Sequence, residues 1–355
     1  MRTLTYSQAI LEATDQCMAR NSKVYLMGLG VTDPKGIFGT TLGLEAKYGG
    51  RRVLDMPTAE NGMTGVAIGS ALVGWRPIMT HQRVDFVLLA MDQIINNAAK
   101  WHYMFGGRMR VPLVIRLIIG RGWGQGPQHS QSLQALFGHI PGLKVVMPTT
   151  SHDAKGLLVA AVEDDNPVIY LEHRWLHGVQ GPVPADYYAV EIGKARTMRE
   201  GRDVTIVAAS YMTLEALHAA ELLAKDGIEA EVVDLRTIKP LDTSHILNSV
   251  RKTGRLIVAD GGWRTFGLSA EIIALVAEEV HGDLKAAPRR VALPDIPTPT
   301  SWALANEYYP RAEHIANAAR SAMGLPEQPI EAEEALGNKN NLPRDVPDKA
   351  FTGPF

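Results

Sequence analysis

The sequence has little cysteine, little charge imbalance and no long apolar run, and each shortage excludes a class of protein. The single cysteine, Cys17, cannot form an internal disulfide, and no Cys/His spacing typical of a zinc site occurs. The 36 basic and 38 acidic residues leave a formal net charge of −2. Composition therefore gives no indication of a nucleic-acid or anionic-membrane partner.

Apolar stretches are short as well. The longest, residues 66–75, cannot span a bilayer. The first 20 residues alternate polar and apolar side chains and lack the apolar block of a signal peptide. We therefore expect a cytoplasmic protein that binds neither a membrane nor nucleic acid.

Two phosphate-binding motifs are also missing. Glycines recur at 120, 122, 124 and 126, but no G-x-G-x-x-G stands between a strand and a helix, and no G-x-x-x-x-G-K-[ST] occurs. A Rossmann-type dehydrogenase is therefore not indicated.

What the sequence does contain is a regular alternation of strand and helix patterns. In the first half, strands are predicted at 23–30, 51–56, 76–80, 111–119, 144–148 and 167–173, with helices at 6–19, 61–74, 87–104 and 153–164. After a linker at 177–188, strands are predicted at 203–210, 229–235, 255–260 and 289–293, with helices between them. The pattern predicts an α/β protein of two three-layer α/β/α domains, at 1–185 and 195–325. Residues 326–355 read as an extended polar tail that lies over a partner or stays mobile.

One carboxylate stands out in the stretch LDMPTAENGMTG at 54–65. Glu60 follows a proline turn after a strand and precedes a glycine-spaced helix. An acid in the first turn of a helix is stabilised by the helix dipole, which is one interpretation. The other is a catalytic carboxylate at a strand-to-helix junction, where ligands of α/β proteins commonly bind. Position alone leaves both open.

A second unusual stretch is the glycine-rich loop that follows the strand ending at 119. It leads into Gln128 and His129, and a histidine in this place suits an acid/base role. An ordinary surface-loop histidine would fit equally well. His139, further along, is more typical of a structural residue.

Together these stretches resemble one family. LDMPTAENGMTGVAIGSALVGWRPI, MDQIINNAAKWHYMFGG, GPQHSQSLQALFGHIPGLKVVMP and, in the second half, DVTIVAASYMTLEALHAAELLAKDGIEAEVVDLRTIKPLD are similar to the β subunit of thiamine-diphosphate-dependent 2-oxo acid dehydrogenase E1 components. The resemblance spans about residues 3–310, and these motifs occur in the family's order and spacing. It implies the two-domain transketolase-type fold and thiamine diphosphate as cofactor.

The resemblance assigns roles to particular residues. Glu60 corresponds to the acid that contacts N1′ of the cofactor's aminopyrimidine, where a shared proton favours the imino form that removes the thiazolium C2 proton. Phe86 corresponds to the aromatic that stacks on the pyrimidine, although an ordinary core phenylalanine remains an alternative. Thr58 and Gln82 are assigned to the cofactor with them. His129 corresponds to the histidine that stabilises or protonates the substrate oxyanion.

The family also carries a potassium ion bound mostly by backbone carbonyls. The matching positions are Leu113, Ala161, Val162, Asp164 and Asn166. Carbonyl sites depend on loop shape more than on side chains, so the string EDDNP at 163–167 supports this site only in part.

The G-D-G…Asn motif that holds the diphosphate through Mg²⁺ is missing. VADGGW at 258–263 is the nearest string, and it lies in the second domain without the asparagine. The resemblance therefore implies half an active site, completed by an α-type E1 subunit that holds Mg²⁺. The expected assembly is α2β2, with a lipoyl E2 as further partner.

The sequence departs from the family after RPI, where it continues Thr80-His81-Gln82-Arg83-Val84-Asp85-Phe86. His81 and Arg83 replace apolar neighbours, and the glycine loop also contains Arg121 and Trp123. The candidate substrate residues are His81, Arg83, Arg121 and Gln128. Surface drift at a subunit interface would explain these changes. A pocket for a polar or anionic substrate would explain them too, because arginine pairs well with carboxylate and phosphate.

Three functions follow from these alternatives. The first is an E1 β subunit that decarboxylates a 2-oxo acid and passes the acyl unit to lipoate. The second is a split transketolase-like subunit that moves a two-carbon ketol unit between sugars. The third is a catalytically silent structural subunit, against which the retention of Glu60, Phe86 and His129 argues.

Overall fold

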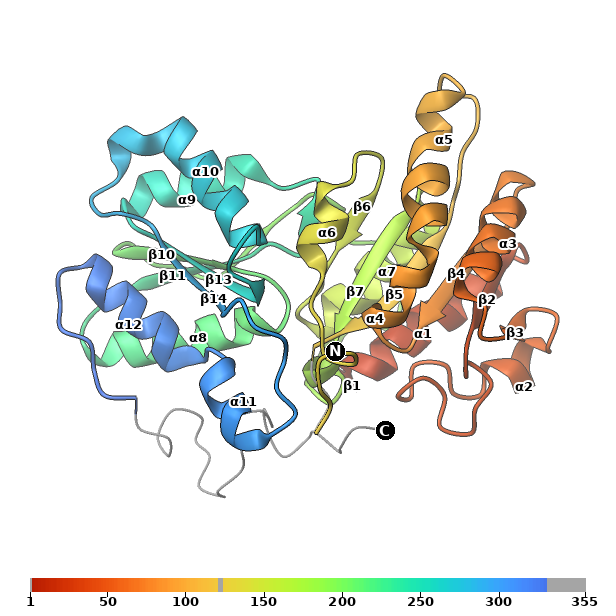
Figure 1. Ribbon diagram of the computed structural model, residues 1–355, viewed down its shortest axis with the longest axis horizontal. Helices are drawn as coiled ribbons and strands as arrows, with labels where there is room; N and C mark the ends of the chain where they lie inside the picture. Colours follow the sequence, from red (N-terminus) through yellow and green to blue (C-terminus); the bar gives the residue numbers. More distant parts are fainter. Residues whose placement is uncertain (1, 121–123, 331–355) are drawn as a thin grey trace. The chain divides into compact units, whose positions relative to one another are not determined.

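The computed structural model describes residues 2–120 and 124–330, and they form two compact units (Figure 1). The first unit comprises the chain up to Gly120 and then Gln128–Ile192. The second comprises the chain from Gly193 onward, together with the loop just before Gln128.

The first unit is built on a parallel sheet. Its strands are neighbours in the order β6 (Lys144–Val146), β7 (Val168–His173), β5 (Val114–Ile119), β4 (Arg76–His81), β2 (Val24–Gly28) and β3 (Val53–Asp55). Every residue of β2, β5 and β7 is buried, as expected where helices cover both faces of a parallel sheet. Parallel pairing brings the carboxyl ends of the strands to one edge of the sheet.

Helices flank this sheet. Helix α1 (Tyr6–Arg20) packs on α7 (Ser151–Glu163), and α3 (Glu60–Leu72) packs on β4. Thr5 and Gln8 form a capping box that satisfies two orphan amides at the start of α1. The short helices α2 (Leu44–Tyr48) and α6 (Gln134–His139), and the 3₁₀ turn η3 (Arg174–Leu176), lie in the connections.

A two-stranded antiparallel sheet joins the ends of the first unit. Strand β1 (Arg2–Thr5) pairs with β8 (Gln180–Val183), with Arg2 opposite Val183. The sequence had indicated a linker here. The difference arises because β8 is stabilised by a partner almost 180 residues away, which local patterning does not reveal.

The prediction of one continuous helix over 87–104 is wrong, because the structure divides this segment into shorter helical turns. It consists of α4 (Val84–Val87), a 3₁₀ turn η1 (Leu88–Ala90), a π-helical turn η2 (Gln93–Ala98) and α5 (Ala99–Met104). Each change in residues per turn rotates the buried face. Ile94 is therefore buried, whereas Leu88, expected on the same face, is 40% exposed.

The second unit contains a sheet in the order β14 (Arg289–Leu293), β13 (Leu256–Trp263), β10 (Val204–Ala208), β11 (Ala230–Asp234) and β9 (Arg196–Arg199). The four predicted strands run parallel, and β9 adds an antiparallel edge that was not predicted. The remaining elements are α8 (Tyr211–Lys225), β12 (Thr237–Lys239), α9 (Thr243–Thr253), α10 (Leu268–Val280), η4 (His281–Asp283), α11 (Trp302–Tyr308) and α12 (Ala312–Ala322).

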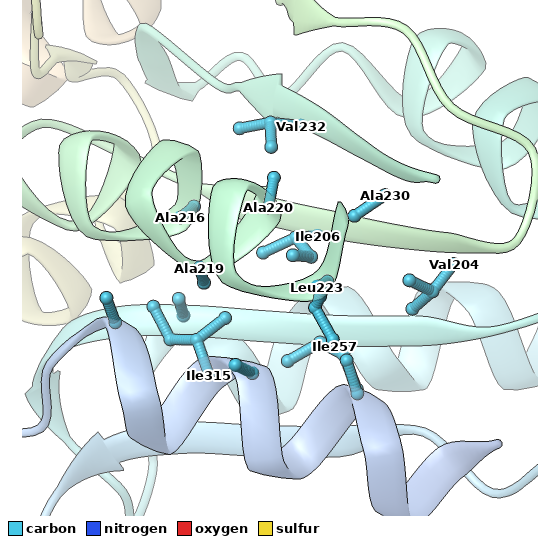
Figure 2. Packing of buried hydrophobic residues seen from close by; sticks show 14 of the residues in the cluster. Val204, Ile206, Ala216, Ala219, Ala220, Leu223, Ala230, Val232, Ile257 and Ile315 are labelled. Atoms are coloured by element: carbon cyan, nitrogen blue, oxygen red, sulfur yellow. The ribbon is translucent and has the colours of Figure 1, made fainter. Parts of the chain in front are cut away.

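Small side chains allow close packing in this second core. Figure 2 shows Ala216, Ala219 and Ala220 of α8 near Ile206 of β10, with Ile315 of α12 in the same cluster. All five are fully buried. Helix α12 was not predicted from the sequence; it is amphipathic and packs its buried alanine face on α8.

The predicted α/β architecture is thus confirmed in both units. Among the described helices, none combines the length and apolarity that a bilayer span requires.

Candidate functional site

The site is assembled at the carboxyl edge of the first sheet, and Glu60 lies there as the first residue of α3. Strand β3 ends at Asp55, and a four-residue turn leads into the helix. Glu60 is 6% exposed, and its carboxylate has no hydrogen-bond or ion-pair partner among residues 2–120 and 124–330. Only its backbone carbonyl is engaged, by the Thr64 hydroxyl at 2.7 Å. A carboxylate buried without a partner is costly, so the position favours a ligand over a simple helix start.

Phe86 and His129 meet at the same edge, although 43 residues separate them in the sequence. Phe86 lies on α4, directly after β4, and its ring meets the His129 ring edge-on, with 5.3 Å between centroids. His129 is exposed, in the loop that follows β5. The Gln131 side chain donates to Asp85 at 2.7 Å, which ties this loop to α4. Two of the three predicted central residues are therefore in direct contact.

The other residues assigned to cofactor and substrate differ in their surroundings. Thr58 and Gln128 are exposed. The Gln82 side chain donates to the Leu29 carbonyl at 3.1 Å and so braces the loop after β2. Arg121 lies outside the described residues.

His81 and Arg83 are interior residues, each only 2% exposed. This burial does not fit simple surface drift, one of the two explanations offered by the sequence. Burial lowers the pKa of His81 to about 4, so its imidazole is neutral near pH 7. Burial, together with the nearby charge of Arg174, lowers the pKa of Arg83 to about 10, and the guanidinium stays protonated.

A buried ionic network lies beneath this edge, and the sequence pattern did not reveal it. Arg116 of β5 donates to both carboxylate oxygens of Glu172 in β7, at 3.0 and 3.1 Å, and to the Thr40 hydroxyl at 2.9 Å. The His177 ring lies 3.5 Å from the same carboxylate. Burial would raise the pKa of Glu172, but Arg116 and His177 outweigh it and keep that pKa lowered. The only available signal was a charged residue inside each of two buried strands.

Two of the five predicted potassium ligands, Val162 and Asp164, accept hydrogen bonds from another cation, Arg76. Arg76 Nη1 donates to the carbonyls of Val162 and Asp164, each at 2.9 Å. The Leu113 carbonyl accepts from the Val168 amide at 2.9 Å. The Asp164 carboxylate pairs with Lys144 and accepts from the Asn166 amide. Ala161 lies in the buried face of α7.

The VADGGW string has a structural role in the second unit. The Asp260 carboxylate accepts from the Gly262 amide at 3.0 Å and from the Ser269 amide at 3.1 Å, at the turn into α10. The described residues contain no group of three or more acidic, histidine or cysteine side chains suited to a metal ion.

Comparison with known proteins agrees with this geometry. Residues 2–178 match the pyrimidine-binding domain of transketolase, and residues 193–315 match the transketolase C-terminal domain. A solved structure of a split-gene transketolase, an inactive β4 tetramer, aligns with a TM-score of 0.74 at 26% identity, covering 92% of this chain and 99% of that one.

More similar in sequence are β subunits of dehydrogenases. The β subunit of acetoin:2,6-dichlorophenolindophenol oxidoreductase from Cupriavidus necator is 46% identical, with 91% of this chain and 98% of the relative covered. The pyruvate dehydrogenase E1 β subunits of Dictyostelium discoideum and Rickettsia bellii are 42% and 41% identical; the alignments cover 90% and 89% of this chain and 91% and 98% of the relatives. The transketolase alternative is not favoured by these identities. The chain belongs to the family of E1 β subunits of thiamine-diphosphate-dependent 2-oxo acid dehydrogenases, on a transketolase-type fold.

Proposed function

We propose that this chain supplies the pyrimidine-binding half of the active site of a 2-oxo acid dehydrogenase that decarboxylates its substrate and transfers the acyl unit to lipoate. The observation that carries the proposal is Glu60, a buried carboxylate without a partner in the described chain, at the edge where Phe86 and His129 meet. Strand ends of parallel sheets are where α/β proteins bind ligands.

The residues fit the pyrimidine end of thiamine diphosphate. Glu60 is placed to hold a proton shared with N1′ of the aminopyrimidine, and Phe86, half-buried beside the His129 loop, offers an aromatic face to the ring. Thr58 and Gln82 lie in the two loops next to them and are assigned to the same ligand. When bound, thiamine diphosphate supplies a nucleophilic carbon and an electron sink.

His129 is assigned the substrate side of the site. It is exposed in the loop after β5, so its imidazole is accessible to a ligand, and its edge-on contact with Phe86 orients it beside the pyrimidine position. A histidine in this place donates a proton or hydrogen bond to the oxygen that becomes negative as the substrate reacts.

The site requires a second chain. The Mg²⁺ and diphosphate side is assigned to an α-type subunit with a G-D-G…Asn motif, in an α2β2 assembly, with a lipoyl E2 as acceptor. Relatives named β subunits of dehydrogenases support such a partner. We also propose that the protein is cytoplasmic, as the sequence predicts.

The potassium site is also retained. Two carbonyls of the predicted set, Val162 and Asp164, converge on the Arg76 guanidinium. Each carbonyl oxygen has a second lone pair for a cation, and the Asp165 carboxylate, 2.7 Å from Arg76 Nη2, offsets the guanidinium charge that would otherwise repel it.

Acetoin is a second candidate substrate. It is favoured by one observation, namely that the relative from Cupriavidus necator, at 46% identity, is named for acetoin, as is one from Bacillus subtilis at 40%. Cleavage of acetoin, a hydroxyketone, would use the same Glu60, Phe86 and His129.

The test uses this chain co-purified with its α-type partner, thiamine diphosphate and Mg²⁺. Reduction of 2,6-dichlorophenolindophenol is followed with pyruvate, 2-oxobutanoate, longer 2-oxo acids and acetoin. We expect Glu60→Gln to lower kcat by about 10²–10⁴-fold, the range for a positioned acid/base group. The matched control is Glu271→Gln, an exposed acid in the first turn of α10, which should leave kcat unchanged.

Two outcomes would overturn the proposal. One is Glu60→Gln activity within twofold of the unaltered enzyme. The other is absence of turnover for every 2-oxo acid and for acetoin. Ketol transfer between sugar phosphates in the same preparation would then revive the transketolase alternative.

A further inference from the structure

A second group of charges, distinct from Glu60 and His129, lies at the same edge of the sheet. Arg83 follows β4 and Arg174 follows β7, and both guanidinium groups lie over the ring of Phe38, at 5.4 and 4.5 Å from its centroid. Arg83 is 2% exposed and Arg174 is 5% exposed. Two like charges thus contact one aromatic ring inside the first unit.

Nearby carboxylates do not neutralise Arg83. Its Nη1 donates to the Gly120 carbonyl at 3.2 Å, and its Nη2 has no hydrogen-bond partner in the part of the chain that the structure describes. Asp85 acts on Arg83 electrostatically but forms no ion pair with it, and its Oδ1 accepts from Gln131. Glu172 is occupied by Arg116, which donates to both of its carboxylate oxygens.

The Arg83 pKa agrees with this geometry. Burial lowers it most, the repulsion from Arg174 lowers it further, and Asp85 raises it by less. At Arg83 the nearby positive charge of Arg174 therefore outweighs the negative charge of Asp85. A buried guanidinium with an unused donor pair is costly unless an anion binds it.

Arg83 is connected to the residues assigned to catalysis. Its carbonyl accepts from the amide of Phe86, at 3.2 Å. Gly120, which accepts from Arg83, donates its own amide to the Gln131 carbonyl at 3.1 Å, two residues beyond His129. Hydrogen bonds thus tie Arg83, whose unpaired Nη2 is itself buried, to the segments that carry Phe86 and His129.

We propose that the substrate carries a second anionic group, remote from its 2-oxo acid function, and that Arg83 Nη2 binds it while Arg174 adds positive potential. This inference rests on the proposed function and names its substrate class, which is a 2-oxo acid with a distal carboxylate, phosphonate or sulfonate. Pyruvate and acetoin lack such a group and would leave Arg83 unpaired. The planar fork of arginine suits all three anions.

The experiment compares substrates that differ only in the distal charge. With the assembled enzyme, kcat/KM is measured for 2-oxoglutarate against 2-oxopentanoate, and for 3-phosphonopyruvate and 3-sulfopyruvate against 2-oxobutanoate. For at least one pair, we expect kcat/KM of the compound with the distal anion to exceed that of the compound with the uncharged tail by about 100-fold. Such discrimination is typical of a site whose buried polar group the substrate must satisfy. The compound with the largest preference shows whether the distal anion is a carboxylate, a phosphonate or a sulfonate.

Variants then assign the effect to Arg83. Arg83→Met should lower the ratio of kcat/KM between the charged and uncharged-tail compounds by about 100-fold, mostly through KM, and Arg83→Lys by less, because one ammonium replaces a fork. The control is Arg108→Met, an exposed arginine, which should leave the ratio unchanged.

The outcomes are separable from those of the proposed function. Turnover of pyruvate or acetoin with no preference for any distal anion would overturn this inference and leave the proposed function standing. An unchanged ratio in Arg83→Lys, or in Arg83→Met where it assembles, would also overturn it. Absence of turnover for every 2-oxo acid and acetoin would overturn the proposed function itself.

Discussion

The buried Arg116–Glu172 pair gives the prediction that the structure defines most fully. Both side chains are fully buried, and the guanidinium meets the carboxylate through two hydrogen bonds at 3.0 and 3.1 Å. Glu172→Gln removes the negative charge but keeps the shape. Arg116 is then left without a counter-charge in the interior, where its acceptors are neutral: the amide oxygen of the new glutamine and the Thr40 hydroxyl.

Removal of one partner from a buried ion pair costs about 3–5 kcal/mol. Because the first unit is about the size for which each kcal/mol shifts Tm by about 2–4 °C, the unfolding temperature should fall by roughly 6–20 °C. The double variant Arg116→Met/Glu172→Met should recover at least half of this loss, because neither charge is then buried unpaired.

The stabilisation by Glu172 should also depend on pH, because only the ionised carboxylate pairs with Arg116. The folded-state pKa of Glu172 lies below the ordinary value of 4.5, so its contribution is present above that value and is lost as pH falls through the folded-state pKa. The stability gap between the unaltered chain and Glu172→Gln should therefore be largest near pH 7 and shrink below pH 4.5.

The assay is urea and thermal unfolding, followed by far-UV and near-UV circular dichroism. The matched control is Glu229→Gln, which removes the exposed partner of Arg202 and should cost about 0–1 kcal/mol. A Glu172→Gln loss no larger than that of Glu229→Gln would refute the reasoning, as would a double variant less stable than the single one.

Three further predictions concern single positions. His81→Phe should reduce the fall in Tm between pH 6.5 and pH 4, measured across this range. In the unaltered chain the buried imidazole, with its pKa lowered to about 4, stays neutral in this range while the unfolded chain binds a proton, so the folded state loses stability. Gly120→Ala should lower the free energy of unfolding by about 1–3 kcal/mol, because φ is +75° and a Cβ would lie 2.3 Å from His173 Nε2. The control is Gly124→Ala, where φ is +68° and no atom lies near the Cβ; it should lower the free energy of unfolding by less in the same urea titration. Thr5→Ala should cost about 1 kcal/mol through loss of the α1 cap, and an unchanged midpoint in urea would contradict it.

Local sequence patterns determined much of this protein. Alternating strand and helix patterns predicted the parallel sheets of both units, because a buried parallel strand reads as a continuous apolar run. Long motifs identified the family and predicted Glu60, Phe86 and His129 as site residues. The contact between Phe86 and His129 follows from their places after β4 and β5, which are neighbours in the sheet.

Tertiary structure alone decided the charge arrangement. Arg116 and Glu172 lie 56 residues apart, and only the parallel pairing of β5 with β7 brings them into one interior network. Arginine is mostly found exposed at protein surfaces, yet the fold buries Arg83 and Arg174 against Phe38. Residue periodicity reports what a segment prefers over one or two turns. The burial of a charge, and so its pKa and its partners, depends on which distant segments cover it, and that is determined by the fold.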